Sequence, residues 1–273
     1  MPLQFKKITP IPQLQKFIEK MWVFESGTEM PSDDINLIVP NGRLRLLIPF
    51  RNSIAATIDG KLYFSKEDCI TLTGIIDVPS KPALRANTGT IGIEFNPVGA
   101  YRFFPLKLSD INNKIYPITD ILGKIGRQLE EEISNTETIK DKLFLLQQFL
   151  LKQPFLQNED SIFEYCVEQI KLSRGRITIK ELEKKTGYSS RWLNMKFKDK
   201  LGISPKNISS IIRFRQYYQA LANNNETAFF ETAFYEYYYD QSHFLKEFKR
   251  FTGLSHQGFE NLPNNFGKLF YKE

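Results

Sequence analysis

Two predicted helices in the second half of the chain carry basic, amide and hydroxyl side chains opposite an apolar stripe. At about 100° per residue, Leu193 and Phe197 define the buried side of the first helix, and Phe244, Phe248 and Phe251 that of the second. The other sides and their flanks carry Arg191, Asn194, Met195 and Lys198 in the first helix, and Gln241, Ser242, Lys246 and Lys249 in the second. Such faces suit a DNA major groove, where Arg reads guanine and Asn or Gln reads adenine. The alternative is a solvated helix face, because many amphipathic helices place Lys opposite Phe.

The charge distribution favours a polyanionic partner for the same region. The chain of 273 residues has a net charge of +6. Residues 171–257 carry 16 basic and 8 acidic residues, whereas residues 155–170 carry four acidic residues and no basic one. A local excess of this size suits nucleic acid, although it also serves solubility.

Short helices joined by tight turns are expected to position the first of these faces. Thr178 and Glu181 form a capping box, and Gly187 is placed to end the helix that follows. Ser189 or Ser190 can then cap the next helix. This predicts a helix-turn-helix over about 178–200.

A second unit of the same kind is expected over about 227–252. Ser204-Pro205 predicts the start of a helix that runs to about Asn223 and is ~27 Å long. A short helix around 226–235 follows, then Asp240 as an N-cap and Gly253 as a terminator. Two helix pairs separated by one long helix indicate a particular architecture far more strongly than either pair alone.

The first half predicts an antiparallel sheet or small barrel over about 20–105, followed by helices over 119–152. Leu44, Leu46, Ile48 and Phe50 alternate with Arg43, Arg45 and Arg51, and Asp59-Gly60 is a hairpin turn signal. Thr119 is a candidate cap for one helix, and 139–151 has the spacing of another. That second helix packs either on a partner copy or on its own sheet.

Composition excludes several classes of site. Two cysteines exclude a disulfide framework and a thiolate-rich zinc site, and the two histidines, His243 and His256, leave the first 240 residues without an imidazole ligand. No stretch approaches 18 consecutive apolar residues, so we expect a cytoplasmic protein without a membrane span. No cofactor motif occurs, and a phosphate-binding glycine loop is absent from the sequence.

The residues of 171–259 resemble the AraC/XylS family of bacterial transcription regulators. ITIKELEKKTGYSSRWLNMKFKDKLGISPKNI is similar to the first helix-turn-helix of that family, and AFYEYYYDQSHFLKEFKRFTGLS to the second. VPNGRLRLLIPF, TGIIDVP and GIEFNPVGAYRFF more loosely resemble the N-terminal domain attached to many such regulators. The resemblance implies an α+β N-terminal sensor or dimerisation domain, 1–154, and an all-α DNA-binding domain, 155–273.

The resemblance also implies roles for individual residues. The two recognition helices would enter successive major grooves, about one DNA turn or ~34 Å apart. The residues implied to face bases are Arg191, Asn194, Met195, Gln241, Ser242 and Lys246. Those implied to meet phosphates are Ser190, Lys198, Lys249 and Arg250, while Asp240 is a structural cap.

This sequence departs from the family pattern at four positions. Glu183 replaces a small alanine between the packed helices, and Met195 stands where a basic residue is frequent. Tyr237 stands where the second turn usually has glycine. If that position needs positive φ, the tyrosine backbone is strained by about 1 kcal/mol or more. His256 replaces a proline near the end.

Three further residues could orient a polar effector in the first half. Arg43, Arg45 and Glu94 adjoin predicted strands, and the alternative is an exposed sheet face with cross-strand ion pairs. Cys69 and Cys166 are interpreted as core residues, and His243 with Asp240 lacks a nucleophile, so we expect no enzyme activity.

The predicted function is a sequence-specific transcription regulator that binds double-stranded promoter DNA. Its first half would bind a small-molecule effector or form a homodimer, and an activator would also contact RNA polymerase. The alternatives are control by a protein partner or by expression level and, more distantly, an enzyme with an undetected site in the first half.

Overall fold

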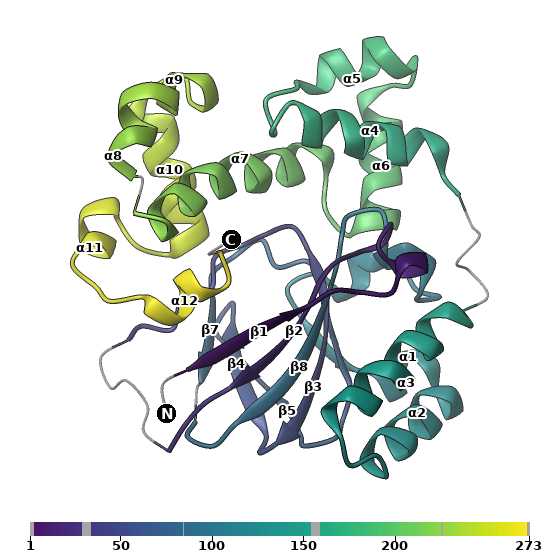
Figure 1. Ribbon diagram of the computed structural model, residues 1–273. Helices are drawn as coiled ribbons and strands as arrows, with labels where there is room; N and C mark the ends of the chain where they lie inside the picture. Colours follow the sequence, from purple (N-terminus) through teal and green to yellow (C-terminus); the bar gives the residue numbers. More distant parts are fainter. Residues whose placement is uncertain (1–2, 29–33, 84, 154–158, 225, 272–273) are drawn as a thin grey trace.

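The computed structural model describes residues 3–28, 34–83, 85–153, 159–224 and 226–271 (Figure 1). An antiparallel β domain with trailing helices is followed by a wholly helical part, which confirms the predicted α+β fold class. The helical part lies along one end of the sheets, and the helix α7 (Pro205–Ala222) crosses above them (Figure 1).

Two antiparallel sheets form the β domain. The larger has the order β1-β2-β8-β3-β6-β9, and the smaller has the order β5-β4-β7. The larger sheet comprises β1 (Gln4–Ile8), β2 (Ile18–Glu25), β8 (Gly89–Phe95), β3 (Leu44–Arg51), β6 (Thr71–Thr73) and β9 (Ile115–Pro117). The smaller comprises β5 (Lys61–Ser65), β4 (Ile54–Ile58) and β7 (Ser80–Ala83). The sheets therefore extend beyond the predicted 20–105 at both ends.

The predicted strand signals correspond to real strands. The Asp59-Gly60 turn joins β4 to β5, with Ile58 opposite Lys61, and both turn residues have positive φ as a tight hairpin requires. The alternating run after Arg43 forms β3, and its neighbour β8 ends before Asn96-Pro97.

Both faces of the larger sheet are covered. Leu44, Leu46 and Ile48 of β3 are buried beside Ile91, Ile93 and Phe95 of β8, and Phe95 packs on Phe103 and Phe104. The opposite face meets the smaller sheet and the chain's C-terminal segment, because Trp22 of β2 packs edge-to-face on Phe270. Arg43 and Arg45, on this second face, are therefore buried instead of solvated.

Helices α1 (Ile118–Leu122), α2 (Lys124–Ser134) and α3 (Ile139–Leu151) lie beside the larger sheet (Figure 1). The predicted cap at Thr119 is wrong: Pro117 precedes α1, and Gly123 with φ of +56° separates α1 from α2. Thr138 caps α3, whose buried side packs within this chain against α2 and the short 3-10 helix at Pro12–Leu14. Two further 3-10 helices, Ala100–Arg102 and Leu108–Ile111, follow β8.

The helical part contains the expected long central helix with shorter helices on either side. They are α4 (Ser161–Leu172), α5 (Ile179–Thr186), α6 (Ser190–Leu201), α7, α8 (Glu226–Ala228), a π-helical turn (Phe229–Ala233), α9 (Phe234–Tyr237), α10 (Gln241–Thr252), α11 (His256–Glu260) and α12 (Asn265–Leu269). Among the described residues, no helix has the length and apolar character needed to cross a membrane.

The C-terminal segment returns to the β domain (Figure 1). Asn264 accepts a hydrogen bond from Leu37 N–H and donates one to the Leu37 carbonyl, both at 2.8 Å. The Tyr271 hydroxyl donates to the Val39 carbonyl, and Phe266 packs edge-to-face on Phe24. These contacts hold α12 against the larger sheet.

Candidate nucleic-acid interface

Local side-chain caps determine where the first helix pair begins and turns. The Thr178 hydroxyl accepts from Glu181 N–H, and the Glu181 carboxylate accepts from Thr178 N–H, which completes the predicted capping box of α5. Gly187 ends α5 in the left-handed region, and Ser189, one of the two predicted candidates, caps α6. Leu193 and Phe197 are fully buried, so the opposite side of α6 faces outward.

The second helix pair uses the same devices at its recognition helix. The Asp240 carboxylate accepts from His243 N–H, and Gly253, with φ of +75°, ends α10. Phe244, Phe248 and Phe251 are all buried, as predicted. The preceding helix differs from a regular one, because a π-helical turn lies between α8 and α9.

The two units are held at opposite ends of α7 (Figure 1). Ser204 caps α7 and Pro205 occupies its first turn, as predicted, and the helix spans 18 residues. Phe214 packs against Phe248 and Phe251 with ring centroids 5.9 and 5.1 Å apart. A buried aromatic cluster therefore anchors α10 to α7.

The residues predicted to face bases from α6 have unequal exposure. Arg191 and Met195 are exposed, Met195 to 61%. Asn194 is half-buried, and its amide donates to the Ser190 carbonyl at 2.8 Å. Arg191 is therefore the freest hydrogen-bonding side chain of the three.

The predicted base-facing residues of α10 are all exposed. Gln241 and Ser242 lie in its first turn and Lys246 one turn further along. Lys249 continues the same outer side and is also exposed. This helix presents an amide, a hydroxyl and two ammonium groups.

Two of the predicted phosphate contacts already have partners within the chain. The Ser190 N–H donates to the carboxylate of Glu183. The Arg250 guanidinium lies 3.3 Å from the Asp77 carboxylate of the β domain. Lys198 and Lys249 are exposed. Neither Glu183 nor Asp77 was predicted as a partner, and only the short spacing from Glu183 to Ser190 could have indicated one.

The departures at Tyr237 and Glu183 have structural explanations. Tyr237 ends α9 without positive φ, so it does not bear the strain considered for a glycine position. Its hydroxyl accepts a hydrogen bond from Arg174 at 3.0 Å. Glu183 stabilises the start of α6 through the Ser190 amide.

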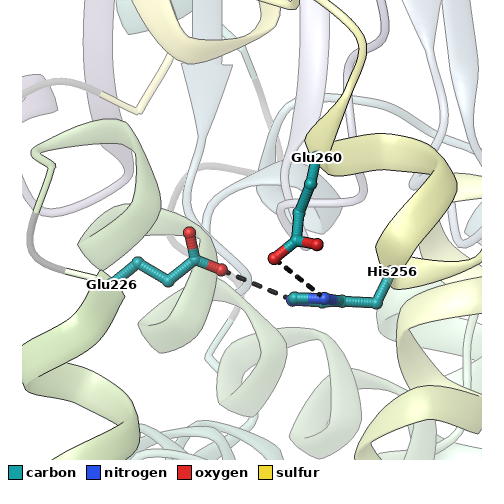
Figure 2. A group of neighbouring side chains, drawn as sticks. All are labelled: Glu226, His256 and Glu260. Carbon is teal, nitrogen blue, oxygen red and sulfur yellow. Dashed lines mark ion pairs between the residues drawn. The ribbon is translucent and has the colours of Figure 1, made fainter.

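His256 lies between two carboxylates at the start of α11 (Figure 2). Its Nε2 is 3.4 Å from Glu226 and its Nδ1 is 3.4 Å from Glu260, while the Tyr217 hydroxyl lies 3.0 Å from Nε2. The hydrogen bond with His256 lowers the pKa of Glu226. Because the carboxylates contact different ring nitrogens, the cluster fits an ionic link between α8 and α11 better than a single metal ion.

The three candidate effector residues meet in one buried group. Glu94 is fully buried and lies 2.8 Å from Arg43, 3.3 Å from Arg45 and 3.9 Å from Lys20. Burial alone would raise the pKa of Glu94, but these three cations outweigh it and hold the pKa at about 2. Cross-strand ion pairs are thus present, but on a covered face, and sequence reasoning did not include Lys20.

The cysteines and His243 do not form a nucleophilic site. Cys166 is buried in α4, and burial raises its pKa to about 11. Cys69 is half-buried, not a core residue as predicted, and burial and Glu130 raise its pKa. A thiol with a raised pKa is a poor nucleophile at neutral pH. Asp240 accepts from the His243 backbone, which is a cap and not a catalytic pair.

Residues 6–117 match the family model described as "Domain of unknown function (DUF6597)". No curated protein matches the sequence. ToxT from Vibrio cholerae is similar in structure, with 12% identity, a TM-score of 0.49 and coverage of 95% of this chain and 98% of that one. ToxT with a bound unsaturated fatty acid has 12% identity, a TM-score of 0.45 and coverage of 86% and 92%. The AraC-like transcriptional activator CuxR has 14% identity, a TM-score of 0.26 and coverage of 81% and 87%.

A β domain precedes two helix-turn-helix units that one long helix connects, as the resemblance of 171–259 implied. At 12–14% identity, the function of this chain has to be inferred from its own residues.

Proposed function

We propose that this AraC-like chain is a transcription regulator that binds double-stranded promoter DNA with sequence preference. The observation that carries the proposal is the pair of capped recognition helices, α6 and α10, each with an apolar side buried on the domain and a polar, basic side exposed. A base-reading helix needs this division, because its buried side fixes the orientation of its exposed side.

Roles for the exposed residues follow from their chemistry. Arg191, Gln241 and Lys246 are the strongest candidates for reading bases, because each is exposed and can donate to base edges in the major groove. Ser242 adds a hydroxyl, and Met195 offers an apolar contact. The amide of Asn194 is already hydrogen-bonded to the Ser190 carbonyl. Lys198 and Lys249 would bind phosphates, and Ser190 and Arg250 would join them after leaving their present partners.

Control by an effector is supported by the β domain. A cavity of about 90 Å³ lies between the two sheets, and α12 closes one side of it through Phe266 and Phe270. Its lining is largely apolar, with Arg45 as a charged group. The β domain is thus not a completely filled barrel, which favours an effector over a purely dimerising module. Homodimerisation, contact with RNA polymerase and a cytoplasmic location belong to the same proposal.

DNA binding is tested by fluorescence anisotropy on the gene's own upstream DNA and on random DNA at several salt concentrations. We expect sequence preference, and we expect Arg191→Ala and Lys246→Ala to reduce it by about 1–3 kcal/mol each. Lys249→Ala should weaken binding to both DNAs and lower the salt slope by about 1. Lys61→Ala, on an exposed strand of the β domain, is the matched control and should leave binding unchanged.

The opposite result is equally clear. Equal affinity for upstream and random DNA at every salt concentration, with and without small-molecule extracts, would contradict sequence-specific regulation. The enzyme alternative would then be reconsidered.

A further inference from the structure

A polar cleft separates the larger sheet from α7 and is distinct from the apolar cavity between the sheets. It consists of two adjoining cavities of about 220 and 200 Å³. Residues shared by both are Glu19, Asn41, Arg43, Arg215 and Gln219. The chain's C-terminal segment contributes Phe270 and Tyr271 to one end. The cleft therefore lies where the β domain and the helix that connects the two DNA-binding units meet.

The cleft contains more positive than negative groups. Lys7, Lys20, Arg43 and Arg215 line it, and Glu19 is the one acidic residue among its described lining residues. Glu19 is already paired with Arg43 at 2.8 Å. Glu94 lies beneath and is shared among Arg43, Arg45 and Lys20. The carboxylates are thus engaged, and cationic charge remains.

Arg215 is a half-buried cation of the cleft that has no partner among the described residues. In the part of the chain that the structure describes, it forms no ion pair and no hydrogen bond. Burial and the nearby Arg43 lower the pKa of Arg215. A guanidinium that has lost water without gaining a carboxylate raises the free energy of the fold, and an incoming anion would relieve this cost.

We propose that this cleft binds a small, water-soluble polyanion bearing phosphate or carboxylate groups, held between Arg43, immediately before β3, and Arg215 on α7. Guanidinium groups bind both kinds of anion in bidentate geometry. The cavity next to the C-terminal segment has a mainly polar lining, and the other has a mixed one, which fits a hydrophilic anion better than an apolar one. Binding of the anion does not depend on the proposed function. Its role as an effector of DNA binding does rest on that function.

The location explains how such an anion would act. It would contact the sheet and α7 at once, so it would favour the arrangement in which the two approach closely. Because α7 carries a helix-turn-helix unit at each end, a change in its position relative to the sheet changes where the units lie. If the two arrangements bind DNA with different affinities, linkage requires that the bound anion changes the DNA affinity.

The binding test uses isothermal titration calorimetry on the full chain with inorganic pyrophosphate and, separately, citrate at constant ionic strength. We expect saturable binding of at least one anion, and the comparison distinguishes a phosphate site from a carboxylate site. Arg215→Gln should weaken it at least tenfold, and Lys20→Gln should also weaken it. Lys206→Gln, which removes one charge from an exposed position of the same helix, should change the affinity less than twofold.

A second variant separates the cleft from the DNA-binding face. The double variant Arg191→Gln/Lys246→Gln removes exposed cations from both recognition helices and should retain anion binding. Absence of saturable binding up to ~10 mM would overturn the proposal, because the affinity would then be too weak for an effector. Equal weakening by Arg215→Gln and Lys206→Gln would also overturn it.

The coupling is measured separately by DNA anisotropy with and without the bound anion. A shift of DNA affinity in the wild type that is lost in Arg215→Gln supports the effector role. An anion that binds in the cleft without changing DNA affinity overturns that role. Failure to bind DNA at all would contradict the proposed function while the calorimetric result stood.

Discussion

Glu94 shows how a single residue can determine the state of its neighbours. It is the buried carboxylate shared by Arg43, Arg45 and Lys20. Without it, Arg45 and Lys20 would lose their carboxylate partner, and Arg43 would keep only Glu19. Burial and nearby Arg side chains lower the pKa of Lys20 to about 8, although Glu94 opposes the change. The attraction of Glu94 therefore opposes the loss of the positive charge on Lys20.

Replacement of Glu94 by Gln is expected to destabilise the fold by about 3–5 kcal/mol, because it leaves buried cations unpaired. The measurement is the free energy of unfolding in urea. Glu25→Gln removes the partner of Arg51 in a partly exposed pair and is the control, with an expected loss of about 1 kcal/mol or less. Similar losses in the two variants would contradict the role of Glu94.

The same residue predicts a pH dependence. The folded pKa of about 2 lies below the unfolded value of about 4.3, so Glu94 stabilises the fold above about pH 4.3. This contribution is lost as the pH falls toward 2, because the unfolded carboxylate binds its proton first. In wild type, the unfolding free energy should fall over this range more steeply than in Glu94→Gln.

The burial of this group was not predictable from the sequence. The alternation of β3 correctly separates Arg43 and Arg45 from Leu44 and Leu46. It cannot tell whether the arginine face meets solvent, because that depends on segments such as α12 and Arg215 of α7, which are distant in sequence. Local alternation reports which side chains share a face and not what covers the face.

At the scale of elements, α6 and α10 follow one plan. Each begins at a side-chain cap, ends at a glycine in the left-handed region, and leads through a serine cap, Ser204 or Ser255, into the next helix. Caps and glycine terminators act over a few residues, so sequence reasoning found most of them. The π-helical turn before α9 had no such local signal.

The two glycine terminators predict different responses to the same substitution. Gly253→Ala should cost about 1–2 kcal/mol, the usual penalty of a left-handed alanine, because its Cβ would lie 3.4 Å from Pro79. Gly202→Ala should cost more, because its Cβ would lie 2.7 Å from the Leu108 carbonyl oxygen. Denaturation in urea measures both, and equal losses would contradict the steric argument.

The contact between Glu183 and α6 predicts opposite effects on stability and DNA binding. Glu183→Ala removes the carboxylate that accepts from Ser190 N–H, so unfolding should become easier by about 1 kcal/mol. The freed amide and the lost negative charge should strengthen DNA binding, because helix N-termini bind phosphate. Thermal melting and DNA anisotropy measure the two effects, and Glu168→Ala in α4 is the control. Weaker DNA binding by Glu183→Ala would refute this assignment.

For the whole molecule, contacts between the β domain and the helical part determine which surfaces are free. Arg102, almost fully buried after β8, pairs with Glu164 of α4, and Asn264 binds the Leu37 backbone. Asp77 receives hydrogen bonds from Asn207 of α7 and Arg250 of α10. The β domain therefore contacts the beginning, the middle and the end of the helical part.

Loss of the Asp77–Arg250 pair is expected to strengthen DNA binding. Asp77→Asn should leave Arg250 available to a phosphate, which raises affinity severalfold and increases the salt slope by about 1. Asp110→Asn removes an exposed carboxylate of the same domain and should have a smaller effect. DNA anisotropy at several salt concentrations distinguishes them, and identical behaviour would show that Arg250 is not restrained by Asp77.

The return of α12 to the sheet has a consequence for how the protein is made. Strands β1 and β2 leave the ribosome before the helical part, and Phe5, Trp22 and Phe24 pack against Phe266 and Phe270, which emerge much later. Until residues 266–270 have emerged, this aromatic face of the nascent chain lacks its cover. Exposed apolar surface of this kind promotes aggregation. Expression at low temperature or with a chaperone should therefore raise the yield of folded protein, and a stop codon after Asn261 should leave the β domain insoluble.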